Sequence, residues 1–330
     1  MSTVYGPVPS WRFGRSLGID VITPPKKCTF NCVYCQLGRT EVHVSGPEKL
    51  KIPTVDVDRV LDDLEDVSRR IDLNTVDIVT FSGAGEPTLN PELDNIAKEV
   101  KNRLRGIPLA ILTNSSLLYL SDVRKGLRQF DLVVAKLDAG DDDTFRLINR
   151  PANERLHVEA VVDSIKRLRE EIKGTLALEV MLLSSKDGHI TNVQDKPLRR
   201  LLDAILDVKP DLVQLEVPYR PPSESFVIPP PRQVIKLVSE ELVEVLGDDK
   251  LWVYGLHDRR GKEVVWLRHK SLEREVLDLL ERRPCRVVDV SASLGISLST
   301  AKSLLRKLEK RNLIDSKKSK KDTYYSYRLS

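Results

Sequence analysis

The sequence predicts an α/β protein with a mostly parallel sheet, followed by a small basic C-terminal domain. Short apolar runs alternate with segments of helical periodicity along most of the chain. Charge marks a boundary near its end: residues 270–330 hold 15 Lys and Arg against 8 Asp and Glu, whereas residues 1–269 hold 38 against 41. We therefore expect a core domain at 1–256, a linker at 257–269 and a second domain at 270–330.

Six apolar runs are predicted to be buried strands because they are short and rich in Val, Ile and Leu: 16–22, 76–82, 107–113, 131–137, 176–183 and 211–217. Segments between and after them repeat apolar residues at helical spacing: 55–71, 91–104, 155–172, 195–207 and 232–246. Alternating strands and helices favour a parallel sheet with crossover helices. Periodicity leaves open whether this sheet stays open or curls toward a barrel.

The last 60 residues or so predict three short helices, at 271–283, 287–295 and 297–312, and then a hairpin. Ser297 or Ser299 is the candidate cap of the third helix. This order resembles a winged helix-turn-helix domain, which implies binding to nucleic acid, RNA ahead of DNA, or contact with a protein. The basic residues that would carry the first role lie on the third helix and at the hairpin tip: Lys302, Arg306, Lys307, Lys310, Arg311, Lys317, Lys318, Lys320 and Lys321.

Three of the four cysteines share one octet, in which Cys28, Cys32 and Cys35 are spaced CxxxCxxC within KCTFNCVYCQLG. Thiolates this close together can bind one metal centre and leave one coordination position open. A zinc site with His43 as a distant fourth ligand is an alternative, although zinc sites usually pair CxxC with a second such motif. A disulfide is disfavoured by the odd number of clustered cysteines and by the absence of a secretory signal. Cys285 lies far away and is expected to be a core residue.

Polar and glycine-rich motifs follow the predicted strands, where the chemistry of a parallel α/β fold usually gathers. The cysteine octet follows the first run, and SGAGEPTLN follows the second. Asparagine, serine and aspartate also close turns and cap helices, so ordinary turn chemistry is the alternative at each strand end. The candidate residues at these strand ends are Gly83, Gly85, Glu86, Thr113, Asn114, Ser115, Lys136, Asp138 and Asn192.

The cysteine spacing, together with Tyr34 just before the last cysteine, resembles the signature of the radical S-adenosylmethionine (SAM) superfamily. The resemblance implies a partial (β/α)6 barrel with a 4Fe-4S cluster on Cys28, Cys32 and Cys35. It also implies that SAM fills the open position on the fourth iron. Cleavage of SAM would give a 5'-deoxyadenosyl radical, which abstracts a hydrogen atom from a substrate.

The same resemblance implies roles for the strand-end residues. Gly83, Gly85 and Glu86 are similar to the Gly-Gly-Glu motif that receives the methionine amino group, although Ala84 interrupts the glycine pair here. The resemblance also implies that Asn114, Lys136 and Asp138 contact the ribose and the methionine carboxylate of SAM. Two further segments could border the substrate. One is the N-terminal stretch near the cluster loop, with Trp11, Arg12 and Arg15, and the other is the mouth of the sixth run, with Glu216, Tyr219 and Arg220. A proline-rich surface turn is the alternative for the second segment.

The order of YGPVPS, the cysteine octet, QLGRT and FSGAGEPTLNP is most similar to the Fe-S oxidoreductase branch related to wyosine-type tRNA-modification enzymes. This implies a radical SAM enzyme, fed by an external electron donor, that acts on RNA or a protein. The wyosine synthases themselves are disfavoured because no cysteines remain for a second cluster. The alternative is a nucleic-acid-binding regulator whose cluster senses redox state or iron.

The chain has no apolar run long enough to cross a membrane, and its first residues have neither the charge pattern nor the apolar stretch of a signal peptide. We therefore expect a cytoplasmic protein without a membrane partner.

Overall fold

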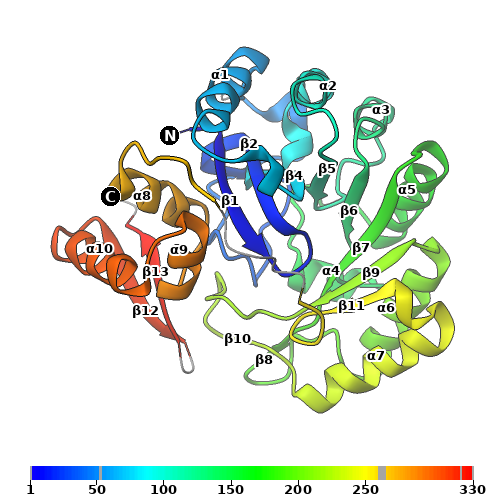
Figure 1. Cartoon of the computed structure of the whole chain (residues 1–330). Coiled ribbons are helices and arrows are strands. Elements are labelled where there is room, and N and C mark those ends of the chain that lie inside the picture. The colour runs from blue at the N-terminus through cyan, green and yellow to red at the C-terminus, as the bar shows by residue number, and fades with distance from the viewer. Residues whose placement is uncertain (1, 52–53, 259–264, 320–321, 329–330) are drawn as a thin grey trace.

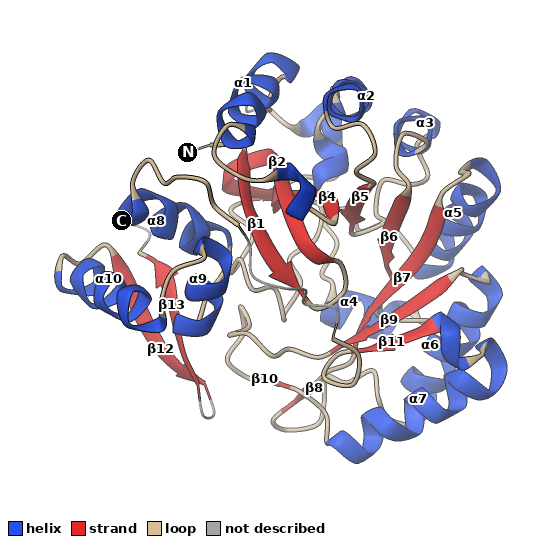
Figure 2. Cartoon of the chain, in the orientation of Figure 1, coloured by secondary structure: helices blue, strands red, loops and turns tan. Residues whose placement is uncertain are grey.

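A computed structural model gives the fold and describes residues 2–51, 54–258, 265–319 and 322–328. It is an α/β fold whose central sheet is mostly parallel (Figure 2). All six predicted strands are confirmed, as β2 (Gly14–Cys28), β4 (Ile78–Gly85), β5 (Leu109–Thr113), β6 (Leu132–Lys136), β7 (Thr175–Met181) and β9 (Leu212–Glu216).

The sheet follows the order β1-β2-β4-β5-β6-β7-β9-β11, with β1 (Val4–Ser10) and β11 (Leu251–Val253) at its two ends. β1 pairs antiparallel with β2 through a tight hairpin, and each later pair along the order is parallel. The short β3 (Val42–His43) also pairs with β2, while β8 (Ser184–Ser185) and β10 (Val227–Ile228) form a separate pair. Figure 1 shows the strands fanned in a curve with helices on the outside, consistent with the expected partial barrel.

Helices connect the parallel strands and bury one apolar face each against the sheet, as crossover connections require. The five predicted helices are confirmed as α1 (Val57–Ser68), α2 (Leu93–Arg103), α5 (Val158–Glu171), α6 (Asp195–Val208) and α7 (Arg232–Leu246). The sequence analysis missed α3 (Ser121–Leu127) and α4 (Asp142–Ile148), because seven residues are too few to establish a helical period.

The C-terminal segment folds as α8 (Leu272–Arg282), α9 (Val287–Leu294), α10 (Leu298–Lys310) and a hairpin of β12 (Ile314–Ser319) and β13 (Asp322–Tyr327). Ser297 caps α10 by accepting a hydrogen bond from the Thr300 N–H. These elements have a hydrophobic cluster of their own, which includes Cys285 and, from the barrel, Val8 of β1. Lys320 and Lys321, predicted at the hairpin tip, lie outside the described residues.

Within the described ranges, we find no helix that combines the length and apolarity needed to cross a membrane.

Candidate functional site

The cysteine loop begins where β2 ends. Cys28 is the last residue of that strand, and Cys32 and Cys35 follow in the loop. The loop is held against the end of α4, because the Val33 N–H donates a hydrogen bond to the Ile148 carbonyl at 2.9 Å. The three thiols line one cavity of about 250 Å³ at the carboxyl ends of the strands. The three cysteines of the octet are therefore brought together in one cavity.

The charge environment of the thiols suits metal binding. Burial, together with the negative charge of a neighbouring thiolate, raises the pKa of Cys28 to about 12 and that of Cys32 to about 11. Burial lowers the pKa of the nearby Lys26, but Cys35 and Cys28 outweigh that effect and raise it. Three thiolates in one cavity need positive charge to balance them, which iron ions supply.

The donor set also fits a cluster in its geometry. In a 4Fe-4S cluster each thiolate binds a different iron, so the sulfur atoms need not converge on one point. In keeping with this, the described part of the chain contains no group of three His, Cys, Asp or Glu side chains placed to hold a single ion.

Two asparagines donate hydrogen bonds to the thiol sulfurs. The Asn114 side-chain amide donates to Cys28 Sγ at 3.5 Å, and the Asn149 amide donates to Cys32 Sγ at 3.6 Å. Such donors stabilise the extra electron of a reduced cluster and raise its potential. Asn114 was a candidate from the sequence, whereas Asn149 was missed because it follows α4 and not a strand.

Glu86 is buried beside the cavity, and side chains and backbone of neighbouring residues hydrogen-bond its carboxylate. Its carboxylate accepts hydrogen bonds from the Thr88 N–H and hydroxyl, from the Thr113 hydroxyl at 2.7 Å and from the Asn114 N–H at 2.6 Å. Burial raises the pKa of Glu86, and these four hydrogen bonds lower it in part. The carboxylate therefore ties the end of β4 to the end of β5.

The glycines before Glu86 let β4 come close to β2. A Cβ on Gly85, whose φ is +140°, would lie 1.6 Å from the Lys27 carbonyl oxygen. A Cβ on Gly83 would lie 2.8 Å from the Ile22 side chain. Both positions thus require glycine for strand packing next to the cysteine loop, whatever ligand they contact.

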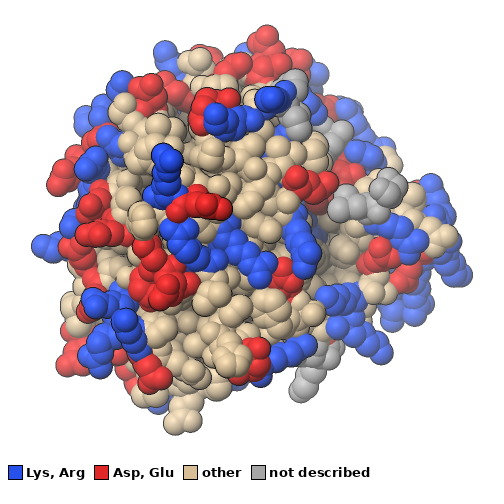
Figure 3. All heavy atoms as spheres, turned by 180° about the vertical axis from the view of Figure 1, so that it is seen from behind, with Lys and Arg blue, Asp and Glu red and all other residues tan. Residues whose placement is uncertain are grey.

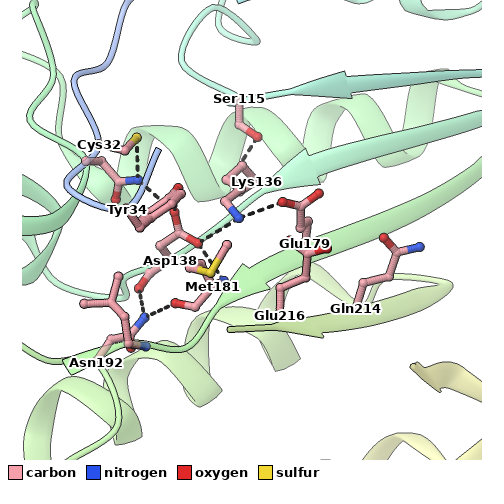
Figure 4. Close-up of polar contacts among 12 residues, drawn as sticks. Cys32, Tyr34, Ser115, Lys136, Asp138, Glu179, Met181, Asn192, Gln214 and Glu216 are labelled. Carbon is pink, nitrogen blue, oxygen red and sulfur yellow. Dashed lines mark hydrogen bonds and ion pairs between the residues drawn. The ribbon is translucent and has the colours of Figure 1, made fainter. Parts of the chain in front are cut away.

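A buried network of charged side chains lies across the barrel from the thiols (Figure 4). The Lys136 ammonium donates to Glu179 at 2.7 Å, and the Arg12 guanidinium donates to the other oxygen of the same carboxylate. Burial would raise the pKa of Glu179, but Arg12 and Lys136 lower it to about 2. Burial lowers the pKa of Lys136, yet Asp138, Glu179 and Glu216 outweigh it and raise that pKa.

Strand register explains this network. Lys136 of β6 stands opposite Glu179 of β7, which stands opposite Gln214 of β9, so the three side chains form a row across neighbouring strands. Arg12 reaches the row from the turn between β1 and β2 and also lies 3.7 Å from Glu216. The sequence analysis named Lys136, Arg12 and Glu216 but missed Glu179, because it looked only after each strand and not along it.

Asp138 lies behind Tyr34 and does not line the cavity. Its carboxylate accepts hydrogen bonds from the Tyr34 hydroxyl, from Asn149 at 2.8 Å and from the Met181 N–H at 2.9 Å. Asn192 donates to the Asp138 carbonyl at 2.8 Å and so braces this residue from below. Of the other candidates, Tyr34, Gly85, Glu86, Asn114 and Lys136 line the cluster cavity, and Gly83 lines a neighbouring one.

Comparison with known proteins agrees with this geometry. A model of the radical SAM superfamily matches residues 22–195, which is more than half of the chain. A UPF0026 protein of Methanocaldococcus jannaschii is 33% identical over 287 residues, covering 87% of this chain and 84% of that protein. A second UPF0026 protein, from Synechocystis, is 40% identical over 218 residues, covering 66% and 76%. A probable GTP 3',8-cyclase of Thermoplasma volcanium is 28% identical over 168 residues, covering 51% and 45%.

Solved structures give weaker likenesses. SuiB of Streptococcus suis, bound to SAM, superposes with a TM-score of 0.48 at 18% identity, covering 72% of this chain and 50% of that one. Coproporphyrinogen III oxidase of Escherichia coli, described as a radical SAM enzyme, gives a TM-score of 0.46 at 12% identity, covering 94% and 85%.

The fold and the cysteine site thus define a radical SAM enzyme, whose cofactors are a 4Fe-4S cluster and SAM. More particularly, the chain belongs to the radical SAM superfamily and to the same family as the UPF0026 proteins.

Proposed function

We propose that this enzyme cleaves SAM reductively and uses the 5'-deoxyadenosyl radical to abstract a hydrogen atom from a substrate that is RNA or a protein. An external donor supplies the electron. The observation that carries the proposal is the meeting of Cys28, Cys32 and Cys35 with polar strand ends in one cavity. The chain's remaining cysteine, Cys285, is fully buried in the C-terminal cluster and does not line that cavity.

In this proposal the cavity residues orient the cofactor. Cys28, Cys32 and Cys35 hold the cluster, while Tyr34, Gly85, Glu86, Asn114 and Lys136 line the pocket for SAM. Asp138 supports this pocket from behind Tyr34, and Gly83 supports it from the adjoining cavity. The cavity offers both signs of charge, since Lys136 and Arg12 face it with Glu179 and Glu216. A zwitterionic amino acid group needs a cation for its carboxylate and an anion for its ammonium, so this lining supports binding of the methionine end.

The proposal is tested by cofactor cleavage. After anaerobic assembly of the cluster, addition of reductant and SAM should yield 5'-deoxyadenosine, measured by chromatography. The reaction without reductant is the control, because the electron must come from outside. An intact cluster that binds SAM but gives no 5'-deoxyadenosine would show the proposed reaction to be wrong.

We further propose that residues 1–256 form the radical SAM core, 257–269 a linker and 270–330 a winged helix-turn-helix domain. Three helices followed by a hairpin support this assignment. The order of YGPVPS, QLGRT and FSGAGEPTLNP around the cysteine octet supports a relation to the wyosine-type tRNA-modification enzymes. The cysteines suffice for one cluster only, and this supports a final reaction different from that of the wyosine synthases.

The C-terminal segment is proposed to recruit RNA in preference to DNA. Seen from behind, Lys and Arg side chains gather over this part of the molecule (Figure 3). Lys307 and Arg311 of α10 are ion-paired with Glu273 of α8. Lys302, Arg306 and Lys310 are exposed on the same helix, and no carboxylate among the described residues pairs with them. These three side chains are therefore available to phosphates.

Replacing Lys302, Arg306 and Lys310 together by glutamine should weaken RNA binding and lower its dependence on salt by about two units of log-log slope, since up to three phosphate contacts are lost. Binding of a short single-stranded RNA, and of DNA of the same sequence, would be measured at several salt concentrations. The matched control replaces Lys98, Arg103 and Arg199, three exposed cations on barrel helices. Equal weakening in both triple variants, or tighter binding of DNA, would contradict the proposal.

A further inference from the structure

A second cavity, of about 190 Å³, adjoins the cluster cavity and lies between the barrel and the C-terminal segment. The two cavities share Gln36, Leu37, Tyr219 and Arg220 in their linings. The far wall comes from the end of α8 and the start of α9, which Figure 1 shows beside β1. A substrate in this second cavity would thus reach the cofactor.

The wall formed by the C-terminal segment is firmly attached. Arg282 of α8 donates to Asp20 of β2 at 2.5 Å, and both side chains are only 5% exposed. The Tyr324 hydroxyl of β13 donates to the Tyr219 carbonyl at 2.9 Å. A buried ion pair and a buried hydrogen bond at separate points fix the position of α8 and α9 over the cavity.

Five arginines line this cavity, and three of them are neutralised by carboxylates: Arg12 by Glu179, Arg282 by Asp20 and Arg286 by Asp289. Arg220 and Arg283 differ from these. The Arg220 guanidinium donates to the neutral Gln36 side chain at 2.7 Å, and no carboxylate in the described part of the chain pairs with either arginine. One further carboxylate, Glu281, borders the cavity, and burial raises its pKa.

Both of these arginines keep a buried donor without an acceptor. The Nε atoms of Arg220 and Arg283 are buried and make no hydrogen bond. A buried donor without an acceptor destabilises the folded protein, and more so when the donor is charged, so these groups indicate a missing anionic acceptor. The Arg220 guanidinium also lies 4.8 Å above the Tyr219 ring, which fixes its orientation.

The positive charges of Arg220 and Arg283 both affect Tyr219, so the two guanidiniums lie on the same side of the cavity. Burial raises the pKa of Tyr219, whereas the positive charges of Arg220, Arg283 and Arg12 oppose that rise. The Tyr219 ring stacks on Tyr254 with a centroid distance of 4.2 Å, and Trp11 packs edge-on against Tyr254 at 5.7 Å. Two guanidiniums that pair with no carboxylate among the described residues therefore lie beside an aromatic wall.

We propose that this cavity binds a phosphate group of the substrate between Arg220 and Arg283, with a substrate ring against the Tyr219–Tyr254 wall. The inference rests on the proposed function, because it assigns the substrate class of the same site. Two arginine forks suit the three or more oxygens of a phosphate, whereas a single carboxylate satisfies only one fork. A nucleotide, free or within a chain, carries both a phosphate and an aromatic ring, and it is the substrate class that we assign to this cavity.

The test uses the enzyme with its cluster and SAM bound, titrated calorimetrically with uridine 5'-monophosphate, inorganic phosphate and malonate. We expect the nucleotide to bind, phosphate to compete with it and malonate to fail to do so. Arg283→Gln and Arg220→Gln should each weaken nucleotide binding about tenfold or more. Arg283→Lys keeps the charge but loses the fork, so it should weaken nucleotide binding less than Arg283→Gln does. If the glutamine variant fails to fold, the lysine variant still tests the role of Arg283.

Arg128→Gln removes one exposed guanidinium that pairs with Glu171 on an outer helix, and it should bind the nucleotide as the parent enzyme does. Absence of nucleotide binding, malonate binding as tight as phosphate, or equal losses in Arg128→Gln and Arg283→Gln would each overturn the inference. Formation of 5'-deoxyadenosine without added substrate needs the cluster, SAM and reductant, and does not need a ligand in this second cavity. That reaction therefore tests the proposed function separately.

Discussion

Replacing Cys28 by alanine should prevent assembly of the 4Fe-4S cluster and lower 5'-deoxyadenosine formation to background, a loss of roughly a thousandfold or more. Cys28 supplies a thiolate at the rigid end of β2, and Asn114 donates a hydrogen bond to its sulfur. Without this ligand a second iron of the cluster would lack a protein thiolate. Iron and sulfide content, visible absorption and 5'-deoxyadenosine yield would be measured after anaerobic assembly.

The matched control is Cys285→Ala, which removes a thiol of the same kind from the C-terminal cluster. This variant should be less stable, because Cys285 is fully buried, but it should keep full iron content per folded molecule. If Cys285→Ala lost its iron and Cys28→Ala kept it, the assignment of the cluster ligands would be wrong.

Replacing Glu179 by glutamine should destabilise the protein by about 3–5 kcal/mol at neutral pH. The substitution keeps the shape of the side chain but leaves two buried cations, Arg12 and Lys136, without their shared anion. The free energy of unfolding would be measured by chemical denaturation. Asp207→Asn is the control, because its pair with Lys166 is exposed and contributes no more than about 1 kcal/mol.

The effect of Glu179→Gln should depend on pH in a definite direction. Arg12 and Lys136 lower the pKa of Glu179 from 4.5 to about 2, so its stabilisation, about 3 kcal/mol, is complete above pH 4.5 or so. This stabilisation is lost as the pH falls from about 4.5 toward 2, where the native carboxyl group also becomes neutral. The gap between parent and variant should therefore close on acidification, and a gap that stayed constant down to pH 2 would contradict the lowered pKa.

Local sequence patterns were sufficient for the positions of the parallel strands along the chain and for the position of the cysteine loop. The six apolar runs are the central parallel strands, because strands buried on both faces of a sheet consist of short runs of Val, Ile and Leu. In such a sheet the carboxyl ends of the strands lie at one edge, so Cys28, Asn114 and Lys136 had to come close together.

Other features depend on contacts between distant segments, which no local pattern reveals. Asn149 reaches Cys32 only because α4 packs under the cysteine loop. Glu179 lies within β7, where its partner Arg12 comes from a hairpin 167 residues earlier in the chain. Charged residues inside a strand usually indicate a solvent-exposed face, and only the curvature of the sheet turns Glu179 inward.

The ion pair between Asp20 and Arg282 makes the enzyme less modular than its two regions suggest. Asp20 lies on β2, the strand that ends in Cys28, and its pKa is raised by burial although Arg282 opposes the rise. An exchange of the C-terminal segment for an unrelated one would leave this carboxylate buried and uncompensated on the cluster-bearing strand. The two regions are therefore expected to have diverged together, and a chimera should require a change at position 20 to remain folded.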